Sequence, residues 1–391
     1  MRKAKLIMVT EENNNKFYNM EERSGDIKVT WGRVGQSGQT SVYPVYKWDS
    51  LYKSKIRKGY KDMTELVRSV STRSGFAKID NESIDTVVNF LVSRSRQNVS
   101  SNYLVTGEDV TRAQIESAQK IIDSISLKSK KIDVSEINKS LIQLYQTIPR
   151  SMRRVQDHLI EAADISVIAE KIKSEQELLD NMSSQVSMSG ASCEHPDKTM
   201  LEHAGLEMYE VTHNDVYIIK RALGSSSRKF ISAFRVKHRL CEDRFNKHVE
   251  SSKNKKIERM WHGSRTENWW SIMSTGLAIR PSNAVHTGSM FGTGIYFADR
   301  SEKSIGYTSL SGSRWASGSD NRAFMCLYKV HVGSQKIIER HDSSCYKLCS
   351  EKIKPHDSVF AKAGVSLYNN EFIIYKSEQC TPEFLVEIGK R

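Results

Sequence analysis

Three short segments of the chain carry a histidine, several aromatic rings and one carboxylate. They read Trp-His-Gly-Ser at 261–264, Gly-Ile-Tyr-Phe at 294–297 and Asn-Glu-Phe at 370–372. Together these residue types suit a site that holds a nicotinamide, stacks against its ring and stabilises a cationic sugar. The set therefore points to a reaction that breaks the bond between a ribose and a nicotinamide.

The nicotinamide part of such a site needs flat surfaces and paired hydrogen-bonding groups. A carboxamide presents one acceptor and one donor in a plane. The backbone C=O and N–H of Gly263, which has no Cβ, can meet both at close range. Tyr296 and Tyr307 are candidates to stack on the ring, and the hydroxyl of Ser304 can add a hydrogen bond to the carboxamide.

The sugar part needs negative charge, because losing nicotinamide builds oxocarbenium character on the ribose. A carboxylate ~4 Å from that cation, at an effective dielectric of about 20, contributes roughly 4 kcal/mol. Glu371 is the candidate. One carboxylate is enough, because nicotinamide leaves as a neutral molecule. Glu371 can also accept a hydrogen bond from a ribose hydroxyl or activate an acceptor hydroxyl.

Each of these residues also has an ordinary structural explanation. His262 could be a plain strand residue, Tyr296 a core residue, and Glu371 a charge at a strand edge. Only their joint occurrence favours the site.

The charge distribution favours a polyanion partner. The 391 residues carry a net charge of +13. Residues 1–79 hold 16 Lys and Arg against 8 Asp and Glu, and residues 186–391 hold 30 against 22, a net of +8 in each case. Residues 80–185 hold 13 against 16, a net of −3. Two basic regions thus flank an acidic middle, although solvated surface is an alternative explanation for both.

Composition also argues against several protein classes. The six cysteines form no Cys-x-x-Cys pair, so free thiols in an intracellular protein are predicted. Cys345, Cys349 and His341 have poor spacing for zinc, and no metal is predicted. The basic start is followed by only four apolar residues, and no apolar run reaches membrane-spanning length, so neither a signal peptide nor a membrane span is predicted.

The hydrophobic period changes along the chain and predicts a multidomain protein. Residues 1–79 are predicted to form a small α+β domain with strands at 6–9, 16–20, 26–34 and 40–46, a hairpin turn at 36–39 and a helix at 48–58. Residues 80–185 are predicted to form an all-α bundle with helices at 80–93, 111–125, 133–148, 152–162 and 164–183. Thr111 is expected to be the N-cap of the helix at 111–125, and Pro149 is expected to end the helix at 133–148.

The last domain, 186–391, is predicted to be α+β and mainly antiparallel. Residues 184–199 are its expected linker. Strands are predicted at 206–211, 216–222, 256–262, 294–297, 323–332 and 371–375. One helix is predicted at 267–275, with Thr266 as its N-cap and Gly276 at its end.

The stretches around the three segments closely resemble the catalytic domain of the poly(ADP-ribose) polymerase family. The resemblance runs through 261–268, 287–299, 303–307 and 368–375. It implies an NAD site made of His262, Gly263, Ser264, Tyr296, Ser304 and Tyr307. In that site His262 and Ser264 hold the adenosine-side ribose, and Tyr307 and Tyr296 enclose the nicotinamide.

The same resemblance implies the catalytic set and the acceptor side. Glu371 is implied to be the catalytic glutamate, which orients the ribose and supports chain elongation, with His262 and Tyr296 beside it. Met290 matches a residue that lines the acceptor site, and Lys303 lies beside the catalytic cleft.

The rest of the chain resembles the DNA-dependent branch of that family. Trp-Gly-Arg at 31–33 looks like a WGR domain, in which such residues contact the DNA backbone near a 5′-phosphate at a break. Asn15, Trp31 and Arg33 are the implied DNA contacts. Residues 80–185 look like a helical regulatory domain that blocks NAD binding until DNA damage loosens it, and Asp180 is implied to contact the adenosine.

Three positions depart from the family pattern. Ala278 stands where relatives place an Arg, and Ser289 where a Tyr is common, so the adenosine side is expected to bind NAD differently. Phe76 stands where DNA-binding relatives often have a Tyr, so one hydrogen bond to the break is expected to be missing.

The sequence as a whole is interpreted as a DNA-break-activated ADP-ribosyltransferase that uses NAD as its substrate. The predicted partners are DNA with strand breaks (5′-phosphate ends), protein acceptors and the protein itself, and the predicted state is a monomer away from any membrane. The expected location is intracellular: the nucleus in a eukaryote, the cytoplasm or nucleoid in a bacterium or phage. Two alternatives stay open, a mono-ADP-ribosyltransferase without elongation and a catalytically weak DNA-binding scaffold.

Overall fold

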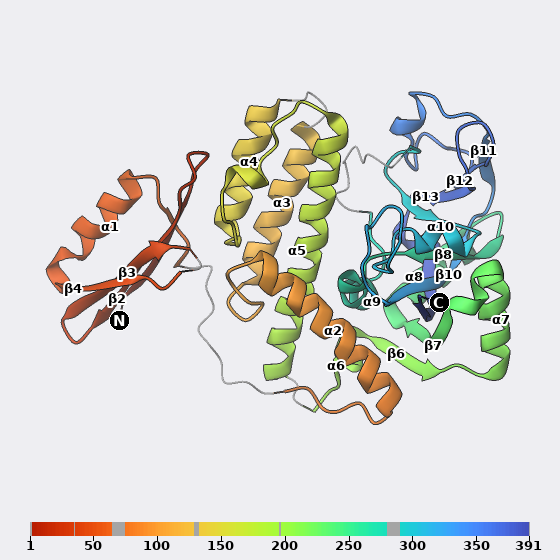
Figure 1. The fold of residues 1–391 in the computed structure, drawn as a ribbon, viewed down its shortest axis with the longest axis horizontal. Helices are drawn as coiled ribbons and strands as arrows, with labels where there is room; N and C mark the ends of the chain where they lie inside the picture. The colour runs from red at the N-terminus through yellow and green to blue at the C-terminus, as the bar shows by residue number, and fades with distance from the viewer. Residues whose placement is uncertain are drawn as a thin grey trace. The chain divides into compact units, whose positions relative to one another are not determined.

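The computed structural model describes residues 2–34, 36–64, 75–128, 133–194, 197–279 and 290–390. The chain forms two compact units, Met1–Arg73 with Asn98–Gly190 and Ser74–Gln97 with Ala191–Arg391. Figure 1 shows the elements of each unit. Helix α2 (Glu82–Asn102) therefore contributes residues to both units.

The N-terminal part of the first unit is an antiparallel sheet with one helix packed on it. Its strand order is β4 (Gln39–Pro44), β3 (Asp26–Arg33), β2 (Asn15–Arg23), β1 (Lys3–Val9) and β5 (Lys61–Asp62). Helix α1 (Trp48–Arg57) buries Trp48 against a core that includes Leu6, Met20 and Ile27. The predicted strands and helix are confirmed, and the two-residue strand β5 was not foreseen.

The remainder of the first unit is helical. Helices α3 (Arg112–Lys128), α4 (Val134–Thr147) and α5 (Ile165–Glu194) lie side by side (Figure 1). Gln119 and Gln176 exchange two hydrogen bonds of 2.8 Å between α3 and α5. The Thr111 hydroxyl accepts from the Gln114 amide at 3.2 Å, which confirms the predicted N-cap. Helix α4 ends at Thr147, before Pro149, as predicted.

Two predictions for this region are wrong. The segment 152–162 contains only the 3₁₀ turn Gln156–His158. The Val155 amide donates to the Asn13 side chain at 3.1 Å and the Ile160 amide to the Asn138 side chain at 2.9 Å, so side chains take the backbone bonds that a helix would need. The predicted linker at 184–199 begins as helix, because α5 continues to Glu194 with Val186 and Met188 buried.

The second unit holds two sheets. The first has the order β6 (Leu206–Glu210), β7 (Phe230–His238), β14 (Cys380–Gly389), β10 (Arg322–His331) and β8 (Ile257–Gly263). The second has the order β11 (Gln335–Ile338), β12 (Ser358–Ala361), β13 (Glu371–Ile374) and β9 (Ile295–Phe297). All neighbouring strands are antiparallel except β11 and β12. The α+β, mainly antiparallel prediction is confirmed for these sheets.

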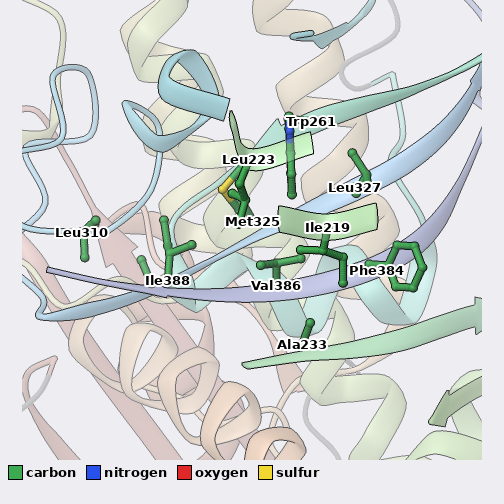
Figure 2. Packing of buried hydrophobic residues seen from close by; sticks show 11 residues of the cluster. Ile219, Leu223, Ala233, Trp261, Leu310, Met325, Leu327, Phe384, Val386 and Ile388 are labelled. Carbon is green, nitrogen blue, oxygen red and sulfur yellow. The ribbon is translucent and has the colours of Figure 1, made fainter. Parts of the chain in front are cut away.

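The helices that accompany these sheets in the described part of the unit include α6 (Met200–Ala204), α7 (His213–Leu223), α8 (Arg239–Ser251), α9 (Trp269–Thr275) and α10 (Ser301–Ile305). Figure 2 shows how Ile219 and Leu223 of α7 pack with buried side chains of the first sheet, among them Met325 and Val386. The indole of Trp261 donates to the Ala222 carbonyl at 3.0 Å and fixes β8 to the end of α7.

The strand predicted at 216–222 is wrong, because these residues belong to α7. Thr212 and Asp215 form a capping box at its start. Asp215, Ile219 and Leu223 are buried at a spacing of four residues, which is the period of a helix face. The contiguous apolar residues at 216–219 are also typical of a strand, which is why the helical spacing was not recognised. The other strands predicted in this unit are present.

The predicted N-cap at Thr266 is also wrong. Thr266 begins the 3₁₀ turn Thr266–Asn268, and its buried hydroxyl has no hydrogen-bond partner among the described residues. Gly276 ends α9 with φ of 79°, as predicted. Within the described ranges, no helix is long and apolar enough to cross a bilayer.

Candidate active site

The first part of the site joins the two sheets of the second unit. The backbones of Trp261 and Ala298 exchange hydrogen bonds of 2.8 and 3.0 Å, which brings the end of β8 against the end of β9. Next to them, Nδ1 of His262 lies 3.0 Å from the carbonyl oxygen of Tyr296. A carbonyl can only accept, so Nδ1 carries a hydrogen and donates it to Tyr296.

The second part is a buried ion pair at the start of β13. The Lys303 ammonium donates to Oε1 of Glu371 and also to the Asn370 carbonyl at 3.3 Å. Burial lowers the pKa of Lys303, and the carboxylate of Glu371 opposes that shift. Oε2 of Glu371 is buried and has no hydrogen-bond partner among the described residues. A buried carboxylate oxygen without a donor is the atom that a ligand hydroxyl would satisfy.

A further set of polar groups holds this pair in place. The Asn370 side chain donates to Asp299 at 2.7 Å and accepts from the Ala363 amide at 2.9 Å. Asn370 therefore fixes the backbone that carries Glu371 and presents its own carbonyl to Lys303. Neither the residue type nor the spacing of Asp299 predicts this role from the sequence.

Gly263 and Ser304 come together as closely as the backbone allows. A Cβ at Gly263 would lie 2.0 Å from the Ser304 carbonyl oxygen, so only glycine fits between β8 and α10. Ser304 is buried. The neighbouring Ser264 hydroxyl accepts from Asn268 at 3.2 Å. The two residues predicted to bind the carboxamide are thus adjacent.

The two predicted stacking rings have different surroundings. The Tyr296 hydroxyl donates to the Gly292 carbonyl at 2.8 Å and accepts from the Phe291 amide at 3.1 Å, which fixes its ring. Tyr307 follows α10, and burial, with a smaller effect of the Glu371 charge, raises the pKa of its hydroxyl to about 12. Tyr307 therefore lies within electrostatic range of Glu371.

The predicted acceptor-side residues lie on different parts of this unit. Lys303 contacts Glu371, as described. Met290 packs against the same hydrophobic cluster as Tyr296, and its carbonyl oxygen lies 2.8 Å from Nε2 of His341. The position of His341 was not anticipated from the sequence.

The structure describes two of the three positions that depart from the family pattern, Phe76 and Ala278. Ala278 is exposed just after α9, whereas Ser289 lies outside the described residues. The Phe76 ring lies 6.0 Å from the ring of His203. Asp180 is on α5 in the first unit and accepts from Gln176 at 2.9 Å, and its adenosine contact stays a prediction.

The predicted DNA-binding residues lie in the first unit. Trp31 is half-buried on β3, with its ring 6.4 Å from that of Tyr18. The Arg33 guanidinium donates to the Asn13 side chain at 3.1 Å and to the Arg153 carbonyl at 2.7 Å. Asn15 is buried and donates to the Arg150 carbonyl at 3.4 Å. Arg33 and Asn15 thus both contact the segment that follows α4.

The described part of the chain can also be searched for metal ligands and for the state of its cysteines. It contains no group of three or more His, Cys, Asp or Glu side chains suited to a metal ion. The cysteines Cys241, Cys326, Cys345, Cys349 and Cys380 are free thiols.

Comparison with known proteins identifies two domains. Residues 209–390 match the poly(ADP-ribose) polymerase catalytic domain, and residues 4–66 match the WGR domain. The first match contains the site residues from His262 to Glu371 but not Asp180, and the second contains Asn15, Trp31 and Arg33.

Individual relatives agree with these matches. A "Putative poly [ADP-ribose] polymerase-like 100L" of Invertebrate iridescent virus 6 is 33% identical over 186 residues, which cover 46% of this chain and 97% of the relative. "Uncharacterized protein 101L" of the same virus is 39% identical over 185 residues, 47% of this chain and 77% of the relative. "Poly [ADP-ribose] polymerase 2" of Arabidopsis thaliana is 23% identical over an alignment that covers 96% of this chain and 71% of the relative.

Proposed function

Because this chain belongs to the poly(ADP-ribose) polymerase family and is an NAD-dependent ADP-ribosyltransferase, we propose that DNA strand breaks activate it and that it builds poly(ADP-ribose) on proteins, itself included. The observation that carries the proposal is how the two carboxylate oxygens of Glu371 are bonded. Lys303 holds one of its carboxylate oxygens, and the other is buried without a donor among the described residues.

The chemistry assigns this carboxylate two tasks. Transfer breaks the bond between C1′ of the ribose and the nicotinamide nitrogen, and the bonding electrons leave with nicotinamide, so positive charge builds on the sugar. Glu371 supplies fixed negative charge next to it, while Oε2 accepts from a ribose hydroxyl or from the hydroxyl of the acceptor. The second task is the one that elongation needs.

The other site residues bind and orient NAD in this proposal. The backbone of Gly263 and the hydroxyl of Ser304 hold the carboxamide, and Tyr307 and Tyr296 enclose the nicotinamide ring. His262, whose ring is oriented by the Tyr296 carbonyl, and Ser264 hold the adenosine-side ribose. Met290 and Lys303 border the acceptor side.

The first unit supplies the sensor and its link to regulation. We assign DNA reading to the WGR domain, within 1–79, through Asn15, Trp31 and Arg33. We assign regulation to the helices of 80–185, with Asp180 as an adenosine contact. The hydrogen bonds from Arg33 and Asn15 to Arg153 and Arg150 support a coupling between the two. DNA would need to favour the active state by a few kcal/mol.

The proposed partners are DNA with 5′-phosphorylated breaks, protein acceptors and the protein itself. We propose a monomer that acts inside the cell, in whichever compartment holds the DNA.

The test is automodification of the full chain with labelled NAD, resolved on a denaturing gel. The reaction is run without DNA, with intact duplex, with nicked duplex carrying a 5′-phosphate and with the same nick carrying a 5′-hydroxyl. A ladder of products that depends on the phosphorylated nick is the expected result. Single ADP-ribose additions would replace the polymerase by a mono-ADP-ribosyltransferase, and equal labelling in all four reactions would remove the sensor.

A further inference from the structure

Trp315 stacks on Tyr307, and nothing in the proposed chemistry uses it. The two ring centroids are 4.7 Å apart and the ring planes differ by 18°. The chain turns back to make this contact, since the amides of Trp315 and Ala316 donate to the Gly306 carbonyl at 2.9 and 3.1 Å.

Glycine at position 306 is what lets the indole approach. A Cβ there would lie 2.4 Å from the Trp315 ring, so any larger residue would push the indole away. The indole therefore covers the backbone at Gly306 and the ring of Tyr307 together.

Trp315 is the more exposed member of this pair. It is 46% exposed, whereas Glu371, which acts electrostatically on Tyr307, is buried. A stacked neighbour occupies only one face of a ring. With the indole on one face of Tyr307, only the opposite face of that ring can stack on a nicotinamide.

The stack continues toward the strand that carries Glu371. The Arg314 guanidinium lies 5.6 Å from the Trp315 ring centroid and 5.9 Å from that of Tyr368. Tyr368, at 91% exposed, precedes Glu371 by three residues. The row of Tyr307, Trp315, Arg314 and Tyr368 thus joins the nicotinamide side of the site to the loop before β13.

We propose that Trp315 is a positioning residue for nicotinamide: it backs the Tyr307 ring from outside and holds it at the angle that stacks on the ligand. The inference rests on the proposed role of Tyr307 in nicotinamide binding. Trp315 touches no reacting atom, so its effect should fall on binding of the nicotinamide half of NAD and not on the transfer step.

The experiment measures binding of nicotinamide itself by calorimetry, together with KM and kcat for NAD. Removing one aromatic stacking partner should weaken nicotinamide binding in Trp315→Ala by roughly 3- to 10-fold. KM should rise by a similar factor while kcat is unchanged. Trp315→Phe should restore most of the affinity, and Gly306→Ala should reproduce the loss. Tyr217→Ala removes another exposed aromatic, on α7, and serves as the control that should change nothing.

The outcomes are distinct. Nicotinamide affinity that is unchanged in Trp315→Ala overturns the inference, and so does tighter binding, which would place the indole on the ligand's own face of Tyr307. A parent protein that binds no nicotinamide would instead overturn the proposed site as a whole.

Discussion

Lys303 and Glu371 form a buried ion pair in which one carboxylate oxygen is held and the other is left without a donor among the described residues. Burial lowers the pKa of Lys303, and the nearby carboxylate favours its charged form. Each charge is therefore tolerated in the interior only because of the other.

Removing the lysine should expose this dependence. Lys303→Met leaves Glu371 as an uncompensated buried charge, and we expect a loss of about 3–5 kcal/mol in the free energy of unfolding. The double variant Lys303→Met with Glu371→Gln should recover much of that loss. Urea unfolding of the parent, the single variants Lys303→Met and Glu371→Gln and the double variant measures the coupling. The exposed pair Lys354 and Glu351 is the matched control, for which the same cycle should give a far smaller coupling. Additive effects at 303 and 371 would contradict the pairing.

Glu371→Gln should separate chemistry from binding. The amide keeps the shape and a hydrogen-bonding oxygen but loses the charge that stabilises the cationic ribose. A loss of roughly 4 kcal/mol corresponds to about a thousandfold slower transfer, with elongation suppressed most. NAD affinity, measured by calorimetry, should change far less, and Glu351→Gln should behave like the parent. An equal loss of binding and elongation would count against this role.

Gly263→Ala tests the closest backbone approach in the site. The new Cβ would collide with the Ser304 carbonyl, which belongs to α10 and cannot yield as a flexible side chain could. We expect α10 to shift, nicotinamide binding to fall below detection and the protein to lose stability. Gly75→Ala adds a Cβ where nothing lies within 4 Å and is the control. Calorimetry with nicotinamide and thermal unfolding are the measurements, and normal nicotinamide binding by Gly263→Ala would refute the assigned contact.

The sequence predicted the segments of this site better than the contacts within it. The motif around His262 and Gly263 and the one at Glu371 fall on strands where expected, because local residue types decide a strand. The contacts of Asp299 with Asn370 and of Trp315 with Tyr307 join residues with no sequence pattern between them. Only the folded chain brings such groups together.

The wrong predictions have a related cause. The segment 152–162 has helical propensity, but the side chains of Asn13 and Asn138 take its backbone amides. The run 216–222 looks like a strand because apolar residues are contiguous, although the capping box at Thr212 and Asp215 starts a helix. In both segments a hydrogen bond decides the structure. In the first segment the partners Asn13 and Asn138 are far away in the sequence. In the second segment the partners Thr212 and Asp215 are neighbours, and their pattern already indicates a helix start.

His248 should make stability depend on pH. Its Nε2 lies 3.1 Å from Nδ1 of His331. Burial has the largest effect and lowers the pKa of His248, and the nearby His331 and Lys376 lower it further. The carboxylates of Glu378 and Asp357 have a smaller, opposite effect. Below pH 6.5 the imidazole of His248 is protonated in the unfolded chain but stays neutral in the folded protein until the pH reaches its lowered pKa. The free energy of unfolding therefore falls as the pH drops toward that pKa.

The variant His248→Gln should lose less stability than the parent between about pH 7.5 and about pH 5.5. Urea midpoints at the two pH values, for parent and variant, measure the difference. His213→Gln, at an exposed position on α7, should keep the dependence of the parent. Identical slopes for His248→Gln and the parent would show that this ring is not responsible.

Trp31→Ala should uncouple the transferase from DNA. The indole is half-buried against Tyr18, next to the strand end that carries Arg33, and we assign it to the DNA backbone. Stimulation by nicked DNA should therefore disappear while the low DNA-free rate stays, because the site in the second unit is untouched. Labelled-NAD assays with and without the nick measure the ratio. Tyr46→Ala, which removes an exposed ring from the same domain, should keep full stimulation. DNA affinity of the parent should also fall steeply with salt, since phosphate contacts release counterions. An unchanged stimulation ratio in Trp31→Ala would reject the sensor assignment, whatever the effect on DNA affinity.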